Sequence, residues 1–179
     1  CAVLGPEDSV RYVELAGGRV VKAQDPFEVL VIGDESGYPF LETIDTVLSG
    51  LFKKFDHGAD VQLVLPNPDL IYPKADQDFG IASGSIALIL EAALERRYPG
   101  RPQLKFARLG KPHAAIFNEA LKRSRTMDMV MIGDQLETDI RGAARFGLDS
   151  VLVNTGIAMV NPDGVDATVQ PTYFLDKLN

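Results

Sequence analysis

The chain has 179 residues, of which 46% are hydrophobic and 24% are charged, and its formal net charge is −7. This is the composition of an ordinary globular protein of one large or two small domains. No apolar run reaches the roughly 18 residues of a membrane helix, and the negative charge argues against a nucleic-acid partner. The single cysteine, Cys1, excludes an internal disulfide and favours a reducing compartment, which we expect to be the cytoplasm.

Predicted strands and helices alternate through the first half of the chain. Short apolar runs predict strands, and apolar residues three and four apart, such as Ile44, Val47 and Leu51, predict helices. We expect strands at Ala2–Gly5, Arg19–Val21, Glu28–Gly33 and Val61–Pro66, and helices at Ser9–Leu15, Pro39–Phe55 and Ser85–Arg97. The segment Asn67–Pro73 is predicted to be a loop.

The alternation continues beyond the turn formed by Gly110, Lys111 and Pro112. We expect a helix at Ala115–Lys122 with Pro112 in its first turn, a strand at Met129–Asp134, a helix that Thr138 caps and Gly147 ends, and strands at Ser150–Gly156 and Pro171–Leu178. Such alternation predicts an α/β fold with a largely parallel sheet. A domain boundary is predicted near Arg108.

Two carboxylates follow the strand predicted at Met129–Asp134, in the stretch "MVMIGDQLETDI". Ligands collect at the carboxyl ends of parallel strands, and acids are costly to bury unpaired, so we expect a cation between Asp134 and Asp139. A few hard oxygen ligands suit Mg²⁺, which keeps several waters. The alternative is that Asp134 begins a loop and that Asp139 favours the beginning of the helix.

Several other polar residues are candidates for substrate contact. Lys111, held between Gly110 and Pro112, could neutralise a phosphoryl oxygen, although a surface lysine is the simpler alternative. His113 is likewise either a substrate contact or a surface residue. Asn67 and Asp69 form either a loop that contacts a ligand or an ordinary turn. The glycines and serines of residues 80–85 either meet an anion or simply begin a helix.

These motifs resemble a known family. "GKPHAAIFNEAL" followed by "MVMIGDQLETDIRGAARFGLDSVLVNTG" is similar to the last two signature motifs of the haloacid dehalogenase (HAD) superfamily. The nearest branch is type IIA, the nitrophenylphosphatase-like hydrolases with a type 2 cap, and "VLGPED", "VLPNPDLIYP" and "GIASGSIALILEAA" agree with it. The resemblance implies that residues 1–108 form an α/β cap for substrate selection. Residues 109–179 would form the C-terminal half of a Rossmann-like core.

The resemblance also implies residue roles. Lys111 would hold the phosphoryl group and the nucleophilic carboxylate, Asp134 would bind Mg²⁺, and Asp139 would bind it or orient its waters. The implied reaction is Mg²⁺-dependent hydrolysis of a small phosphorylated metabolite through an aspartyl-phosphate intermediate. Caps of this kind also serve as dimer surfaces, so a homodimer is compatible with the resemblance.

The nucleophile is the missing part of this pattern. The family uses the first aspartate of an Asp-x-Asp motif, and Asp34 comes nearest but is followed by Glu35 and Ser36. We therefore expect the motif upstream of Cys1, in a longer protein, and an open hydrophobic edge on the sheet formed after residue 108. Two alternatives stay open: a non-catalytic α/β module that binds Mg²⁺ or a phosphorylated ligand, and a phosphotransferase.

Overall fold

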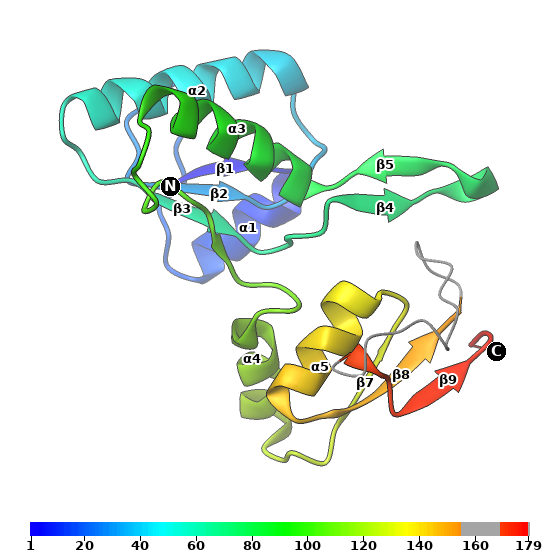
Figure 1. The fold of residues 1–179 in the computed structure, drawn as a ribbon. Coiled ribbons are helices and arrows are strands. Elements are labelled where there is room, and N and C mark those ends of the chain that lie inside the picture. The colour runs from blue at the N-terminus through cyan, green and yellow to red at the C-terminus, as the bar shows by residue number, and fades with distance from the viewer. Residues whose placement is uncertain (155–168, 179) are drawn as a thin grey trace. The chain divides into compact units, whose positions relative to one another are not determined.

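The structure is a computed structural model that describes residues 1–154 and 169–178 (Figure 1). Helices alternate with strands, and the strands of the two larger sheets are parallel, so the predicted α/β class is confirmed. The chain forms two compact units: Cys1–Ile71 with Gly80–Arg108, and Tyr72–Phe79 with the described part of Leu109–Asn179. None of the described helices is long and apolar enough to cross a membrane.

A four-stranded parallel sheet forms the centre of the first unit. Its strands are β1 (Ala2–Leu4), β2 (Val29–Ile32), β3 (Gln62–Leu65) and β6 (Ala107–Arg108), in the order β1-β2-β3-β6. Helices α2 (Phe40–Asp56) and α3 (Ser83–Arg97) lie over one face, and α1 (Glu7–Leu15) lies on the other (Figure 1). This cover on two faces explains why the strands are apolar in succession.

The core of this unit lies between the sheet and the two longer helices. Helix α2 buries Ile44, Val47 and Leu51 at the predicted steps of three and four residues. Helix α3 buries a similar stripe that includes Leu90 and Leu94. These stripes fix both helices on the sheet, so the loop that follows β3 packs against the beginning of α3.

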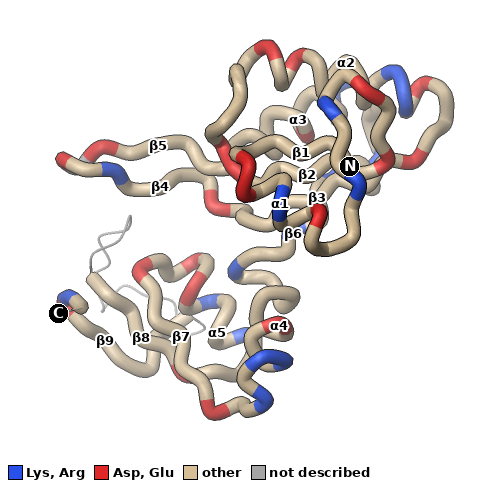
Figure 2. Tube along the Cα trace, turned by 180° about the vertical axis from the view of Figure 1, so that it is seen from behind, with Lys and Arg blue, Asp and Glu red and all other residues tan. Residues whose placement is uncertain are grey.

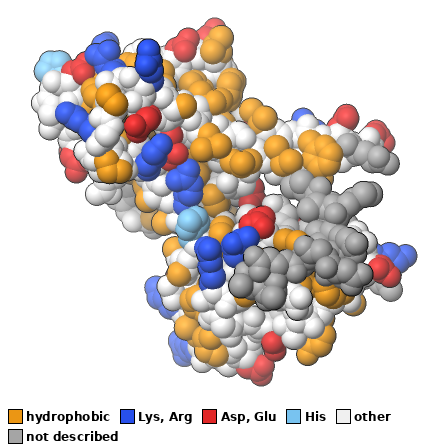
Figure 3. Space-filling view, in the orientation of Figure 1, with side chains coloured by type: hydrophobic (Ala, Val, Ile, Leu, Met, Phe, Trp, Pro, Cys, Tyr) orange, Lys and Arg blue, Asp and Glu red, His pale blue; other side chains and the backbone are white. Residues whose placement is uncertain are grey.

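The structure corrects two predictions in the first half of the chain. The segment predicted as a loop contains β4 (Ile71–Pro73), which pairs with β5 (Phe79–Ile81) across the 3₁₀ turn η1 (Ala75–Gln77). Its prolines signalled only a turn, but proline is tolerated in an edge strand. Figure 3 shows apolar side chains along this hairpin. The segment Arg19–Val21 forms no strand, because only Val21 makes a parallel bridge, to Ala2.

The second unit contains a three-stranded parallel sheet with the order β7-β8-β9. Its elements are α4 (Ala114–Ser124), β7 (Val130–Gly133), the π-helical turn η2 (Leu136–Ile140), α5 (Arg141–Phe146), β8 (Asp149–Val153) and β9 (Tyr173–Leu175). Ile140, Leu152 and Val169 form its buried cluster. The strand predicted at Ser150–Gly156 ends at Val153, and Thr155 and Gly156 lie outside the described residues.

The helices of this unit begin differently from the prediction. Thr138 lies inside η2 and caps nothing, and Gln135 precedes the turn. A threonine cap is not required there, because Asp139 accepts the N–H groups of Asp134 and Gln135 instead. Pro112 lies before α4 rather than in its first turn, whereas Gly147 ends the following helix as predicted, with φ 80°.

Replacing each of two helical glycines of the first unit with alanine should have opposite effects on stability. At Gly50, inside α2, an added Cβ would lie 3.7 Å from Phe27 Cε1, which is an ordinary contact. At Gly84, in the first turn of α3, it would overlap the carbonyl oxygen of Pro68. Gly50→Ala should raise the free energy of unfolding by about 0.5–1 kcal/mol through helix propensity. Gly84→Ala should lower it by about 1–3 kcal/mol, because the backbone must shift. Urea unfolding measures both changes, and effects of the same sign would contradict this difference in packing.

Candidate functional site

The predicted acidic pair lies at the carboxyl end of β7, where acidic positions precede α5 (Figure 2). The Asp139 side chain is 1% exposed, and its Oδ2 accepts hydrogen bonds from the backbone N–H groups of Asp134 (3.2 Å) and Gln135 (3.1 Å). A Cβ on Gly133 would overlap this carboxylate. Glycine at position 133 therefore lets the carboxylate fold back onto the end of the strand and hold the loop that carries Asp134.

Lys111 approaches the same carboxylate from the loop before α4. Its Nζ lies 2.5 Å from Asp139 Oδ1, and its side chain is 31% exposed. Helix α5 packs closely against this loop: a Cβ on Gly142 would lie 2.6 Å from Phe117 Cζ and 3.0 Å from Pro112 Cα, so a side chain there would require the Phe117 ring and the loop to shift. The Gly-Lys-Pro turn and the "GDQLETD" stretch, separate in sequence, thus meet in one ion pair.

Asp134 is the carboxylate of the site that takes no part in this ion pair. Its side chain is half-buried and has no hydrogen bond or ion pair with any other described residue. Over the described part of the chain, no three His, Cys, Asp or Glu side chains form a metal cage. Mg²⁺ does not require such a cage, because it usually binds through one or two carboxylates, waters and a substrate phosphate. The half-buried carboxylate at a strand end fits that mode of binding.

The structure places His113 at a different feature of the second unit. His113 is exposed and lines a recess of about 200 Å³. The other lining residues are Pro112, Ala114, Gly142, Arg145 and Phe146. Lys111, Asp134 and Asp139 are not among them, so the imidazole is not grouped with the acidic pair.

Asn67 and Asp69 lie in the first unit, in the loop that follows β3. Asn67 Oδ1 accepts the backbone N–H of Asp69 at 3.1 Å, which is the geometry of a polar turn. The carbonyl oxygen of Asp69 accepts the N–H of Gly84 at 2.9 Å. The loop is therefore held firmly at the carboxyl end of a parallel strand, where ligands are commonly bound.

The glycine and serine segment of residues 80–85 leads into the first turn of α3, and several of its polar groups already have hydrogen-bond partners. The Ser85 hydroxyl donates to the carbonyl oxygen of Leu70 at 2.5 Å, and the Gly84 N–H is bonded to Asp69. Ser83 is 1% exposed, and its hydroxyl lies 3.5 Å from Glu35 Oε2. Of the two interpretations of this segment, the helix start is the one that these contacts favour.

Asp34 and Glu35, considered in the sequence only as an incomplete Asp-x-Asp motif, form an acidic group at the end of β2. Asp34 and Glu35 follow this strand, and the Tyr38 hydroxyl donates to the Asp34 carbonyl oxygen at 3.3 Å. Burial, with the charges of Asp34 and Glu35, raises the pKa of Tyr38 to about 12. A phenol is protonated at neutral pH in any case, so the raised pKa keeps Tyr38 a hydrogen-bond donor into more alkaline solution.

Asp76 and Asp78 have the Asp-x-Asp spacing expected of the nucleophile, although no role was predicted for them from the sequence. Both are exposed and lie in the turn between β4 and β5, where Asp76 has a positive φ of 58°. The expected motif follows the central parallel strand of the core. This turn follows no strand of either parallel sheet, so its aspartates do not fit that role.

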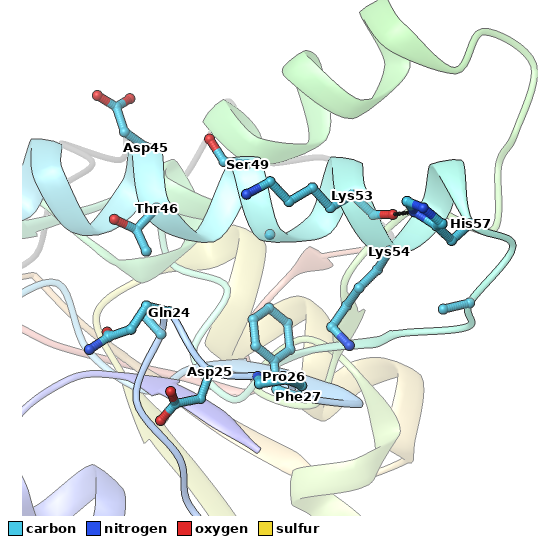
Figure 4. Close-up of a pocket in the computed structure, with 13 residues that line it drawn as sticks. Gln24, Asp25, Pro26, Phe27, Asp45, Thr46, Ser49, Lys53, Lys54 and His57 are labelled. Carbon is cyan, nitrogen blue, oxygen red and sulfur yellow. Dashed lines mark hydrogen bonds between the residues drawn. The ribbon is translucent and has the colours of Figure 1, made fainter.

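A cavity lies elsewhere in the first unit (Figure 4). Its volume is about 640 Å³, and it lies between the second half of α2 and the segment before β2. Its labelled lining residues are Gln24, Asp25, Pro26, Phe27, Asp45, Thr46, Ser49, Lys53, Lys54 and His57. It lies by the amino ends of the strands, opposite to where α/β folds bind ligands, and it contains none of the predicted site residues.

Comparison with known proteins agrees with the family resemblance. Residues 108–179 match the HAD-hydrolase-like family model. Over 162 residues, the chain is 28% identical to the dihydroxyacetone phosphatase of Corynebacterium glutamicum, in an alignment that covers 87% of this chain and 51% of that protein. The chain thus spans about half the length of this curated relative.

Solved structures have the same fold. A structure described as a possible sugar phosphatase of the HAD superfamily, from Cytophaga hutchinsonii, is 27% identical, with a TM-score of 0.77 over 98% of this chain and 63% of that one. A glycerol phosphate phosphatase of Mycobacterium tuberculosis, solved with calcium, is 28% identical, with a TM-score of 0.75 over 97% of this chain and 48% of that one.

Proposed function

Because this chain belongs to the haloacid dehalogenase superfamily, in its nitrophenylphosphatase-like branch, we propose that it is part of a phosphatase for small phosphate monoesters. The relatives named above are described as a dihydroxyacetone phosphatase, a glycerol phosphate phosphatase and a possible sugar phosphatase. A small phosphorylated metabolite of that kind is the substrate class we propose here.

One observation carries the proposal: the ion pair of Lys111 and Asp139 lies beside Asp134, whose carboxylate has no partner among the described residues. In the proposed site, Asp134 binds Mg²⁺. Lys111 places an ammonium group where it can neutralise a phosphoryl oxygen. The main role we propose for Asp139 is to position Lys111 and the loop that carries Asp134, since both of its oxygens are already engaged.

The proposed cofactor fits these residues. Bound Mg²⁺ would stabilise the negative charge that develops on the phosphoryl oxygens. The related glycerol phosphate phosphatase was solved with calcium, another divalent cation with a preference for oxygen ligands. The nucleophilic aspartate is expected upstream of Cys1.

We further propose that the two parts of the chain have different tasks. Residues 109–179 would be the second half of the catalytic core, and residues 1–108 would be a cap that selects the substrate. Asn67 and Asp69, held at the end of β3, are the proposed substrate contacts of the cap, and the third contact is His113.

A second candidate function is a module that binds Mg²⁺ or a phosphorylated ligand without turnover. The observation in its favour is that no Asp-x-Asp pair follows a parallel strand in the described residues, although the metal end of the site is present. A phosphotransferase on the same scaffold would differ only in the acceptor of the phosphoryl group.

A panel of phosphate monoesters tests the proposal. The full-length protein should release inorganic phosphate from at least one of them in Mg²⁺, and EDTA should abolish the release. Binding of Mg²⁺ by calorimetry with no release from any ester would instead support the non-catalytic module. Transfer to an added alcohol without loss to water would indicate a phosphotransferase.

A further inference from the structure

The cavity between α2 and the segment before β2 has the size and the mixed lining of a small-molecule site. Its volume of about 640 Å³ lies within the range of about 300–1,000 Å³ that is usual for ligand pockets. Its apolar lining residues are Ala23, Pro26, Phe27 and Ala59. Two lysines, Lys53 and Lys54, add positive charge from the last turn of α2. Apolar surface with a few charged groups is the composition that holds a small ligand in one orientation.

The two lysines are available to a ligand. The Nζ atom of Lys54 lies 5.4 Å from the centroid of the Phe27 ring, and Figure 4 shows this side chain turned from α2 toward the ring. Lys53 extends along the helix toward Ser49. Lysines in a last turn complement the helix dipole, but that role does not require the inward direction of Lys54. Over the described part of the chain, neither lysine forms an ion pair with a carboxylate.

The acidic residues of the lining do not neutralise this positive charge. Asp25 and Asp45 are exposed, and both carboxylates point away from the Phe27 ring in Figure 4. The chain as a whole has a formal net charge of −7, so its surface has no general attraction for anions. An anion that binds in this cavity would therefore do so through the local charge of the two lysines.

Gly50 leaves space between the helix and the wall of the cavity. Glycine inside a helix is less favourable than alanine, and close packing does not require it here, since an added Cβ would lie 3.7 Å from Phe27 Cε1. Gly50 and Phe27 both line the cavity, so a longer side chain at position 50 would extend into it. The absence of that side chain leaves room for the apolar part of a ligand.

We propose that this cavity binds a small organic anion, with its carboxylate or similar group at Lys53 and Lys54 and its apolar part beside Gly50 and Phe27. A compact body of about one or two rings suits a cavity of this size. None of the residues proposed for hydrolysis lines it, so the inference does not depend on the proposed function.

Titration of the 179-residue chain with naphthalene-2-carboxylate, followed by amide NMR, tests this site. The probe should bind with a Kd of about 1 mM or lower, and its neutral analogue naphthalene-2-carboxamide should bind about tenfold more weakly. The shifted amide signals should be concentrated in residues 23–27 and 49–59. Lys54→Met should remove the preference for the carboxylate, because methionine keeps an apolar chain and loses the ammonium group.

The matched control is Lys74→Met. The Lys74 ammonium group also lies over an aromatic ring, 5.5 Å from the centroid of Tyr72, but it does not line this cavity. Its replacement should leave both affinities within about twofold of the parent. A second variant, Gly50→Leu, should weaken the carboxylate and the carboxamide alike by about tenfold, because the new side chain occupies the cavity. Urea unfolding should show no loss of stability in Gly50→Leu, since leucine favours a helix.

The outcomes separate the alternatives. No binding of the carboxylate by the parent chain up to about 10 mM would refute the proposal. Equal affinities for the carboxylate and the carboxamide would refute the assignment of an anion. Shifts centred on Lys111 would place the anion at the ion pair with Asp139 instead. A dimer of the parent chain that Gly50→Leu dissociates and the carboxylate does not would overturn the proposal and assign this face to a second copy. Phosphate release that persists in the full-length protein after any of these results would leave the proposed function standing.

Discussion

Replacing Asp134 with asparagine is expected to reduce Mg²⁺-dependent phosphate release by the full-length protein about a thousandfold, which corresponds to about 4 kcal/mol of lost transition-state stabilisation. Asparagine keeps the size of the side chain and loses its charge. Asp134 is the carboxylate of the site that Lys111 does not pair with, since the lysine contacts Asp139. The change therefore removes the proposed anionic metal ligand and leaves the ion pair in place.

The matched control for this variant is Glu137→Gln, three residues further along the chain. The Glu137 side chain is 74% exposed and is paired with Arg141 at 2.6 Å. An exposed pair of this kind contributes little, so activity should stay within about twofold of the parent. Calorimetric titration of the 179-residue chain with Mg²⁺ gives a second readout, in which only Asp134→Asn should lose binding. Mg²⁺ binding and turnover that survive in Asp134→Asn would show that the metal assignment is wrong.

The second large effect is expected on stability, from Asp139→Ala. This change removes the acceptor of two backbone N–H groups and leaves Lys111, which is mostly buried, without its partner. Breaking a buried pair from one side typically costs about 3–5 kcal/mol, and because Lys111 is partly exposed we expect the lower end of that range. Urea unfolding of the 179-residue chain measures the loss.

A double-mutant cycle with Lys111→Met separates the two contributions of Asp139. If the ion pair dominates, the double variant should be more stable than Asp139→Ala alone, because it contains no unpaired ammonium group. If the N–H acceptors dominate, adding Lys111→Met to the Asp139→Ala variant should give no recovery of stability. A loss below about 1 kcal/mol for Asp139→Ala would contradict the buried geometry of its carboxylate.

Periodicity predicted most of the helices and strands, because these elements bury one regular stripe. Helix α2 is the clearest case, with Ile44, Val47 and Leu51 buried at the predicted spacing. Helix α3 gives a weaker signal, because Ile89 is 48% exposed whereas Glu91 is buried, so its apolar residues do not single out one face. The β4–β5 hairpin was missed because its strands have only three residues each and β4 ends in a proline.

The candidate site was predicted through charge and chain order. Asp134 and Asp139 at a strand end, with Lys111 in a constrained turn, suggested that these groups lie close together, and Lys111 and Asp139 form an ion pair at 2.5 Å. Sequence spacing could not predict that the two acids have different environments. The difference arises because Gly133 has no side chain and therefore leaves room for the Asp139 carboxylate. For the same reason, Thr138 was taken for a cap when Asp139 provides the acceptor.

The shared carboxylate of Asp139 links the two halves of the site energetically. One oxygen holds the ammonium group of Lys111, and the other holds the loop that presents Asp134. An anion that draws the lysine away from Asp139 would change the charge and hydrogen bonding of the group that anchors this loop. Affinities for an anion and for a cation should then depend on each other, and thermodynamic reciprocity requires each ligand to alter the binding of the other by the same factor.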